Sequence, residues 1–187
     1  MSRLSIAWVF LFSPLNAIAD KVDLQFSKVS LSARQPCTTK NTSYTVVPDG
    51  RGITVLLDGL TLDTQGAKQT TLNVQCRLTI HFTNVVPTDQ SLLFMLRGTE
   101  VRSGTASSAL TVRINGARQT AIAAPPAGDS EGKLDRNYLW RPASKLRKIL
   151  VSVELSARTL NLDDSYAVVA VDSIDACFIK DPKRQTC

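Results

Sequence analysis

Histidine is nearly absent from this sequence, because His81 is the only one among the 187 residues. A hydrolytic triad or a histidine metal site would have to use it, yet the chain has no G-x-S-x-G motif, no H-E-x-x-H motif and no second histidine. We therefore interpret His81 as an exposed or half-buried residue of a polar strand face, and we expect no serine–histidine hydrolase activity.

Closely spaced cysteines are also absent. The four cysteines are separated by 39, 101 and 10 positions, and no C-x-x-C motif occurs: Cys37, Cys76, Cys177 and Cys187. Structural zinc sites use clustered cysteine and histidine, and calcium loops use a D-x-D-x-D-G pattern that is missing here. We predict neither a metal site nor a cofactor.

Long apolar runs are missing beyond the first twenty residues. The start of the chain, MSRLSIAWVFLFSPLNAIAD, has one basic residue, an apolar middle and an A-x-A exit at Ala17 and Ala19. This layout predicts a signal peptide over 1–19. A membrane anchor would need about 20 apolar residues without the interruption at Pro14. We expect residues 20–187 to be one secreted or periplasmic domain without a transmembrane segment.

In an exported chain, an even number of cysteines predicts disulfide bonds. Four cysteines allow three pairings. We favour Cys37 with Cys76 and Cys177 with Cys187, because each pair joins neighbours in the sequence.

Convincing amphipathic helices are lacking, and apolar runs rich in Val, Ile and Thr recur between turn signals instead. These runs are 22–31, 43–47, 53–62, 71–82, 92–101, 109–123, 149–158 and 166–179. About eight or nine strands at this spacing predict an all-β fold, a single antiparallel β-sandwich stapled by disulfides. Residues 123–137, rich in proline, glycine and polar side chains, are expected to form a long loop.

The run 71–83, TLNVQCRLTIHFT, alternates with a period of two, as a half-buried strand does. One face is polar and includes Arg77 and His81. The other face is apolar and is expected to lie in the core: Leu72, Val74, Cys76, Leu78, Ile80 and Phe82.

A strong excess of charge is absent. The chain carries 22 Lys and Arg against 16 Asp and Glu, and removing 1–19 leaves a net charge of about +5, too modest for us to expect a nucleic-acid partner.

The position of the cations is more informative than their number. Six cations and two aromatic rings fall within one stretch of sixteen residues: Lys133, Arg136, Tyr138, Trp140, Arg141, Lys145, Arg147 and Lys148. Cations beside aromatic rings suit an acidic polysaccharide or another anionic envelope component. The alternative is a solvated segment with Trp140 plugged into the sandwich edge.

Carboxylates gather in the last third of the chain: Glu154, Asp163, Asp164, Asp172 and Asp175. A pair of acids roughly 5 to 10 Å apart can hydrolyse glycosides, whereas the same residues are common in turns. A glycan hydrolase is therefore the alternative enzyme hypothesis.

Several phrases taken together resemble a family of small secreted proteins catalogued as domain of unknown function 4360. They are Pro36-Cys37, ITVLLDGLTL, CRLTIHF followed by Pro87, RGTEVRSGTASSALTVRING, the phrase 138–142 (YLWRP) and the phrase 172–175 (DSID). The resemblance implies a secreted β-rich domain without an established activity, and it supports the pairing of Cys37 with Cys76. The chain departs from the family pattern in having Pro36 before Cys37 and Ala143 in place of a cysteine.

From these observations we expect a secreted, non-enzymatic β-sandwich that binds a glycan or an anionic envelope component. The alternatives are the carboxylate hydrolase and an inhibitor or effector that acts on another protein. Asn41 begins an N-x-S/T sequon, which matters only in a eukaryotic secretory route. The sequence leaves the ligand and the oligomeric state open.

Overall fold

The computed structural model of the protein describes residues 24–32, 36–65, 71–122, 130–159 and 165–179. These residues form eleven strands: β1 (Phe26–Leu31), β2 (Thr42–Val46), β3 (Gly52–Leu57), β4 (Thr61–Asp63), β5 (Thr71–Val86), β6 (Ser91–Ser103), β7 (Ser107–Ile114), β8 (Ala117–Arg118), β9 (Ser130–Trp140), β10 (Leu146–Arg158) and β11 (Tyr166–Ile179). Within the described ranges no helix is long and apolar enough to cross a membrane.

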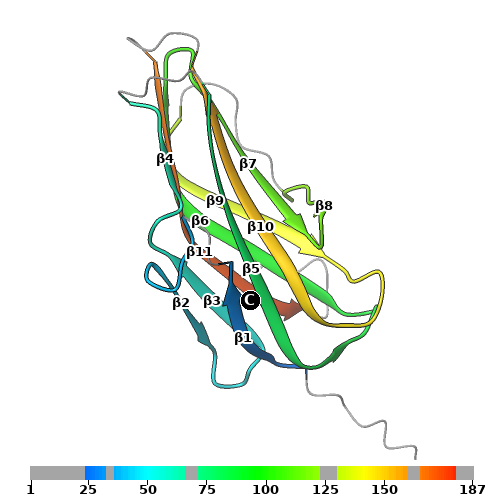
Figure 1. Ribbon diagram of the computed structural model, residues 1–187. Helices are drawn as coiled ribbons and strands as arrows, with labels where there is room; N and C mark the ends of the chain where they lie inside the picture. Colours follow the sequence, from blue (N-terminus) through cyan, green and yellow to red (C-terminus); the bar gives the residue numbers. More distant parts are fainter. Residues whose placement is uncertain (1–23, 33–35, 66–70, 123–129, 160–164, 180–187) are drawn as a thin grey trace, which may run out of the picture.

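The strands form two antiparallel sheets that pack face to face, so the predicted β-sandwich is confirmed. Sheet A has the order β1-β5-β10-β7-β8, and sheet B has the order β2-β3-β11-β6-β9, with β4 also paired to β11. In Figure 1 the long strands β5 and β10 of sheet A run obliquely across β6, β9 and β11 of sheet B. The strand number exceeds the expected eight or nine partly because the run 53–62 is broken into β3 and β4 and because β8 is very short.

Strand β5 has the two faces that its alternating sequence predicts. Leu78, Ile80 and Phe82 are buried against sheet B, whereas Arg77 is exposed on the outer face and His81 is partly exposed there. The strand pairs with β1 on one side and with β10 on the other. Strand β5 therefore supplies side chains both to the core and to the outer face of sheet A.

Bulges shift which residues of a strand face the core. In β11 the inward residues are Val169 and Val171 before a register shift, and Ile174 and Ala176 after it. One extra residue at the bulge moves the apolar set from odd to even positions. A prediction that assumed uninterrupted alternation along β11 would therefore place the residues on one side of the bulge on the wrong face of the sheet.

One side edge of the sandwich is closed by apolar side chains, and we call it the closed edge. The rings of Phe26, Phe82 and Phe178 have centroids 4.8 to 5.6 Å apart and join the two sheets. The backbone amide of Phe26 also donates to the carbonyl of Gly50, in the turn between β2 and β3, at 2.8 Å. Sheet A and sheet B are thus connected by both packing and hydrogen bonding along this edge.

The predicted bond between Cys37 and Cys76 is confirmed. Both residues are buried, and their Cα atoms are 5.4 Å apart. The bond ties the connection between β1 and β2 to the middle of β5. Cys76 lies on the core-facing side of β5, where its disulfide bond attaches this connection to the core.

The second predicted pair is only partly described. Cys177 is buried and is not a free thiol, but Cys187 lies outside the described residues, so its pairing with Cys177 stays a prediction. Cys177 belongs to a small cluster on the outer face of sheet B, together with Leu93, Met95 and Ile179.

The opposite side edge is formed by β8 and β9 and corrects one expectation. Residues 130–137, predicted as part of a long loop, belong to β9, which pairs with β6 over its whole length. Leu134, Tyr138 and Trp140 alternate on the inner face, but Gly132 and the interleaved charges obscure that period in the sequence. The remainder of the expected loop, 123–129, lies outside the described residues.

Candidate functional site

The structure divides the predicted contact segment between several surfaces. On β9, Lys133 is exposed on the outer face of sheet B, whereas Arg136 lies on the inner side. Tyr138 and Trp140 are buried in the core, with 3% and 8% of their surfaces exposed. The aromatic rings and Lys133 face opposite ways because side chains alternate across a strand.

The remaining four cations of that segment are all exposed. Arg141 and Lys145 lie in the connection between β9 and β10, where Arg141 Nε donates to Ser91 Oγ at 3.3 Å. Arg147 and Lys148 lie near the start of β10, directly after Leu146, and β10 belongs to the other sheet. The eight residues are close in sequence but do not form one surface. Trp140 is buried at the sandwich edge, as the alternative interpretation expected.

The acids proposed for a hydrolase are likewise separated. Glu154 lies on the outer face of sheet A, and Asp175 lies on the outer face of sheet B, where it accepts from Thr54 Oγ1 at 2.5 Å and approaches Arg97 at 3.6 Å. Asp172 is exposed beside the β11 bulge. Asp163 and Asp164 lie outside the described residues. No two of these three described acids face each other across a common cleft.

A different site is formed where the two sheets separate at the edge made by β8 and β9. A crevice of about 370 Å³ opens there between β6 and β9 on one side and β7 and β8 on the other. Its volume is in the range of about 300 to 1,000 Å³ that is typical of small-molecule sites. The crevice is lined by Glu100, Ser108, Ala109, Leu110, Arg118, Gln119, Thr120, Ala121, Leu134, Arg136, Tyr138 and Val169.

One glycine allows strand β6 to approach its neighbour just before the crevice. A Cβ atom on Gly98 would lie 1.9 Å from the backbone oxygen of Ala170 on β11. No side chain fits at that distance, so β6 and β11 can pair closely here only with glycine. Two residues further along the same face, Glu100 points into the space between the sheets.

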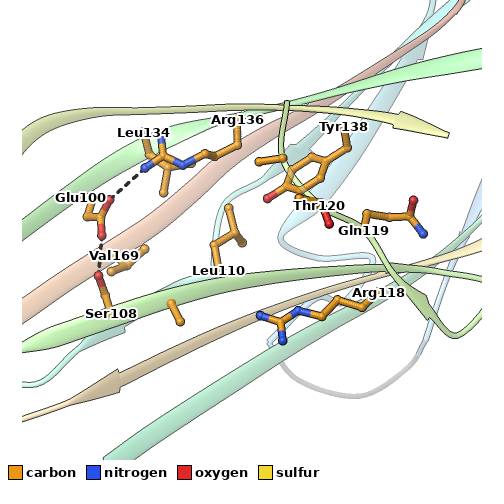
Figure 2. Close-up of a pocket in the computed structure, with 12 residues that line it drawn as sticks. Glu100, Ser108, Leu110, Arg118, Gln119, Thr120, Leu134, Arg136, Tyr138 and Val169 are labelled. Atoms are coloured by element: carbon orange, nitrogen blue, oxygen red, sulfur yellow. Dashed lines mark hydrogen bonds and ion pairs between the residues drawn. The ribbon is translucent and has the colours of Figure 1, made fainter. Parts of the chain in front are cut away.

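Glu100 is the centre of a polar cluster on the crevice wall. Arg102 Nε lies 3.3 Å from Glu100 Oε1, and Arg136 Nη2 lies 3.4 Å from Oε2. Ser108 Oγ donates a short hydrogen bond to Oε1, and Figure 2 shows this chain of contacts from Arg136 through Glu100 to Ser108. The cluster holds β6, β7 and β9 together and keeps this carboxylate occupied with partners.

Tyr138 brings to the crevice a hydroxyl that has no partner among the residues that the structure describes. Only 3% of the residue is exposed, and no described residue hydrogen-bonds to its hydroxyl. Burial raises the pKa of this hydroxyl, and Arg136 and Arg118 offset part of that effect. The group therefore stays protonated at neutral pH and is able to donate a hydrogen bond.

Arg118 reaches the crevice from the opposite side. Asn115 and Gly116 have φ values of 50° and 85°, as a two-residue hairpin turn requires, and this turn folds β8 back along β7. The Arg118 guanidinium makes no ion pair or hydrogen bond with any residue that the structure describes. Figure 2 shows Arg118 across the crevice from Tyr138 and Arg136, with Leu110 between them.

The sequence analysis missed this site except for Arg136 and Tyr138. Arg118 and Gln119 belong to the run 109–123, which was expected to be one strand but turns back at Asn115-Gly116, and nothing in the sequence indicates that β8 faces β9. Within the described ranges no group of three or more His, Cys, Asp or Glu side chains is placed to hold a metal ion.

Comparison with known proteins adds no relative: no family model, no curated protein and no solved structure matches the chain.

Proposed function

We propose that this protein is a secreted or periplasmic binding protein that holds an acidic group, such as the carboxylate of an acidic sugar, in the crevice between β8 and β9. The observation that carries the proposal is a pair of hydrogen-bond donors without partners among the described residues, the Tyr138 hydroxyl and the Arg118 guanidinium, on two walls of one crevice. Guanidinium groups bind carboxylates through charge-assisted hydrogen bonds, and the tyrosine hydroxyl can donate a hydrogen bond to the same acceptor.

The rest of the crevice suits a sugar acid. Leu110, Leu134 and Val169 provide an apolar lining, and Gln119 and Thr120 carry groups that can hydrogen-bond to sugar hydroxyls. Two arginines already surround the single carboxylate, Glu100, so the electrostatic environment favours an incoming anion. Binding is favoured over glycoside hydrolysis because the crevice lining contains one carboxylate rather than a pair.

Export is part of the proposal. The disulfide between Cys37 and Cys76 fits an oxidising compartment. The signal peptide expected over 1–19 lies outside the described residues, and the resemblance to the domain of unknown function 4360 rests on the sequence phrases alone.

Calorimetric titration with galacturonate, and with galactose as the neutral counterpart, tests the proposal. Galacturonate should bind more tightly, because only it carries the carboxylate. Tyr138→Phe should weaken its binding about tenfold or more, since a hydrogen bond to a charged group contributes about 1.5 to 3 kcal/mol. Arg118→Gln should weaken it similarly.

Two matched variants at the closed edge serve as controls. Tyr44 and Arg51 are both exposed there, so Tyr44→Phe and Arg51→Gln should leave galacturonate binding unchanged. Equal binding of galactose and galacturonate, absence of binding, or an equal loss in the controls would reject the crevice as the site.

A further inference from the structure

The outer face of sheet A brings together cations from four strands. Lys28 on β1 and Lys148 on β10 lie on either side of His81 on β5, and we call these three the lysine row. Further along the sheet, Arg77 on β5 and Arg113 on β7 lie on either side of Ser152 on β10, which we call the arginine row. Each row spans two strand spacings, about 10 Å, and the rows are about 13 Å apart along β5.

The charge on this face is not balanced by acids. Lys28, Arg77, Arg113 and Lys148 are exposed and form no ion pair with another described residue. The described strands of sheet A carry one carboxylate on this face, Glu154. The face therefore presents a positive potential over an area much larger than one small ligand.

The surroundings of the cations are polar and nearly free of apolar side chains. Ser30 and Thr79 lie between the rows, and Gln75, just beyond the arginine row, donates from Nε2 to Ser152 Oγ at 2.9 Å. Leu150 is the single large hydrophobic residue exposed on the described part of this face. Proteins that lie on membranes need several apolar or aromatic side chains to insert, so this composition favours a hydrated polymer over a lipid surface.

From this arrangement we infer that the outer face of sheet A is a docking surface for an acidic polysaccharide, a chain whose carboxylate or sulfate groups lie along the lysine and arginine rows. Charge complementarity and hydrogen bonding supply the attraction, and the open face of the sheet accepts an extended chain. The inference is independent of the crevice, which holds one acidic group and uses different side chains.

His81 makes this surface sensitive to pH. It is flanked by Lys28 and Lys148 on the neighbouring strands and is hydrogen-bonded to Ser30 Oγ at 3.1 Å. Its burial and the two lysines lower the pKa of His81. A bound polyanion acts against that lowering, so the complex takes up a proton and becomes tighter as the pH falls.

Binding to dextran sulfate, with uncharged dextran as the matched polymer, tests the surface. Sulfate esters keep their charge between pH 5 and 8, so any pH effect comes from the protein. The full-length protein should bind dextran sulfate but not dextran, and the affinity should fall as salt rises. The double variant Arg77→Gln/Arg113→Gln should bind about tenfold more weakly at low salt.

Lys133→Gln/Lys145→Gln is the charge-matched control, because both lysines are exposed on other surfaces and the net charge falls by the same amount. It should bind like the wild type. The wild type should also bind about two- to fivefold more tightly at pH 5 than at pH 8, and His81→Gln should lose that difference.

Three results would reject the inference: equal weakening in the charge-matched control, binding of dextran, or binding to phosphatidylglycerol vesicles as tight as to dextran sulfate. The crevice is tested separately. Arg77→Gln/Arg113→Gln should still bind galacturonate as the wild type does, and Tyr138→Phe should still bind dextran sulfate.

Discussion

The two side edges of the sandwich are built from different chemistry. At the closed edge, three phenylalanine rings fill the space between the sheets, and the Cys37–Cys76 bond fastens the adjoining connection to β5. At the edge made by β8 and β9, the space between the sheets is lined by a carboxylate, two arginines and a tyrosine hydroxyl. One edge contributes mainly stability, whereas the other gives up apolar packing for groups that are able to bind a ligand.

The outer faces of the two sheets differ in a similar way. On sheet B, Arg97 is paired with Asp175, and Leu93 and Met95 are buried beside them. On sheet A, Arg77 and Arg113 are exposed without an acidic partner among the described residues. Charges that stabilise a fold are commonly paired, so cations left together without acids are better candidates for recognition.

The largest expected effect comes from breaking the closed edge. Phe82→Ala removes a 5% exposed ring that contacts both Phe26 and Phe178, and it should lower the free energy of unfolding by about 3 to 5 kcal/mol. Leu110→Ala at the crevice should cost only about 1 to 2 kcal/mol, because Leu110 is partly exposed. Denaturant unfolding measures both values.

Equal losses in the two variants would contradict the proposed difference between the edges. Galacturonate binding provides a second comparison. Phe82→Ala, measured below its unfolding transition, should keep the crevice intact, whereas Leu110→Ala should weaken binding because Leu110 lines the site.

The disulfide should have the next largest effect. Replacing Cys37 and Cys76 together by alanine should lower the free energy of unfolding by about 4 kcal/mol, because the bond restricts a long loop in the unfolded chain. Peptide mapping without reduction should recover Cys37 joined to Cys76 and, in a second peptide, Cys177 joined to Cys187. A peptide that joins Cys177 to Cys37 would contradict both pairings.

The features that could be predicted from sequence are those set by local periodicity. The alternation in 71–83 correctly assigned Leu78, Ile80 and Phe82 to the core and His81 to the polar face. Such predictions succeed because the side chains of one strand have only two faces available. The fold class follows, since many such strands can bury their apolar faces only against another sheet.

The candidate sites depend on which strands lie side by side, and a single sequence does not contain that information. Lys28 and Lys148 are far apart in the chain but flank the same histidine, whereas Lys133 and Arg136 are close in the chain but lie on opposite sides of β9. Sequence distance therefore groups Lys148 with Lys133, which lies on the other sheet, and not with Lys28. Bulges add a second difficulty, because one inserted residue reverses the faces beyond it.

The smallest predicted effect is the ionisation of Tyr138, and it reports directly on the crevice. Burial raises the pKa of its hydroxyl above the usual 10, despite the opposing influence of Arg136 and Arg118. The folded protein therefore retains a proton at a pH where the unfolded chain has lost it, so stability should begin to fall as the pH rises above about 10. The phenolate absorbance of the wild type minus that of Tyr138→Phe, followed against pH, should give a titration midpoint above 10.

A titration midpoint at or below 10 would mean that the two arginines outweigh burial and that the crevice is more hydrated than the low exposure of Tyr138 indicates. Galacturonate should move the midpoint higher still, because a bound carboxylate accepts a hydrogen bond from the neutral hydroxyl and repels the phenolate charge.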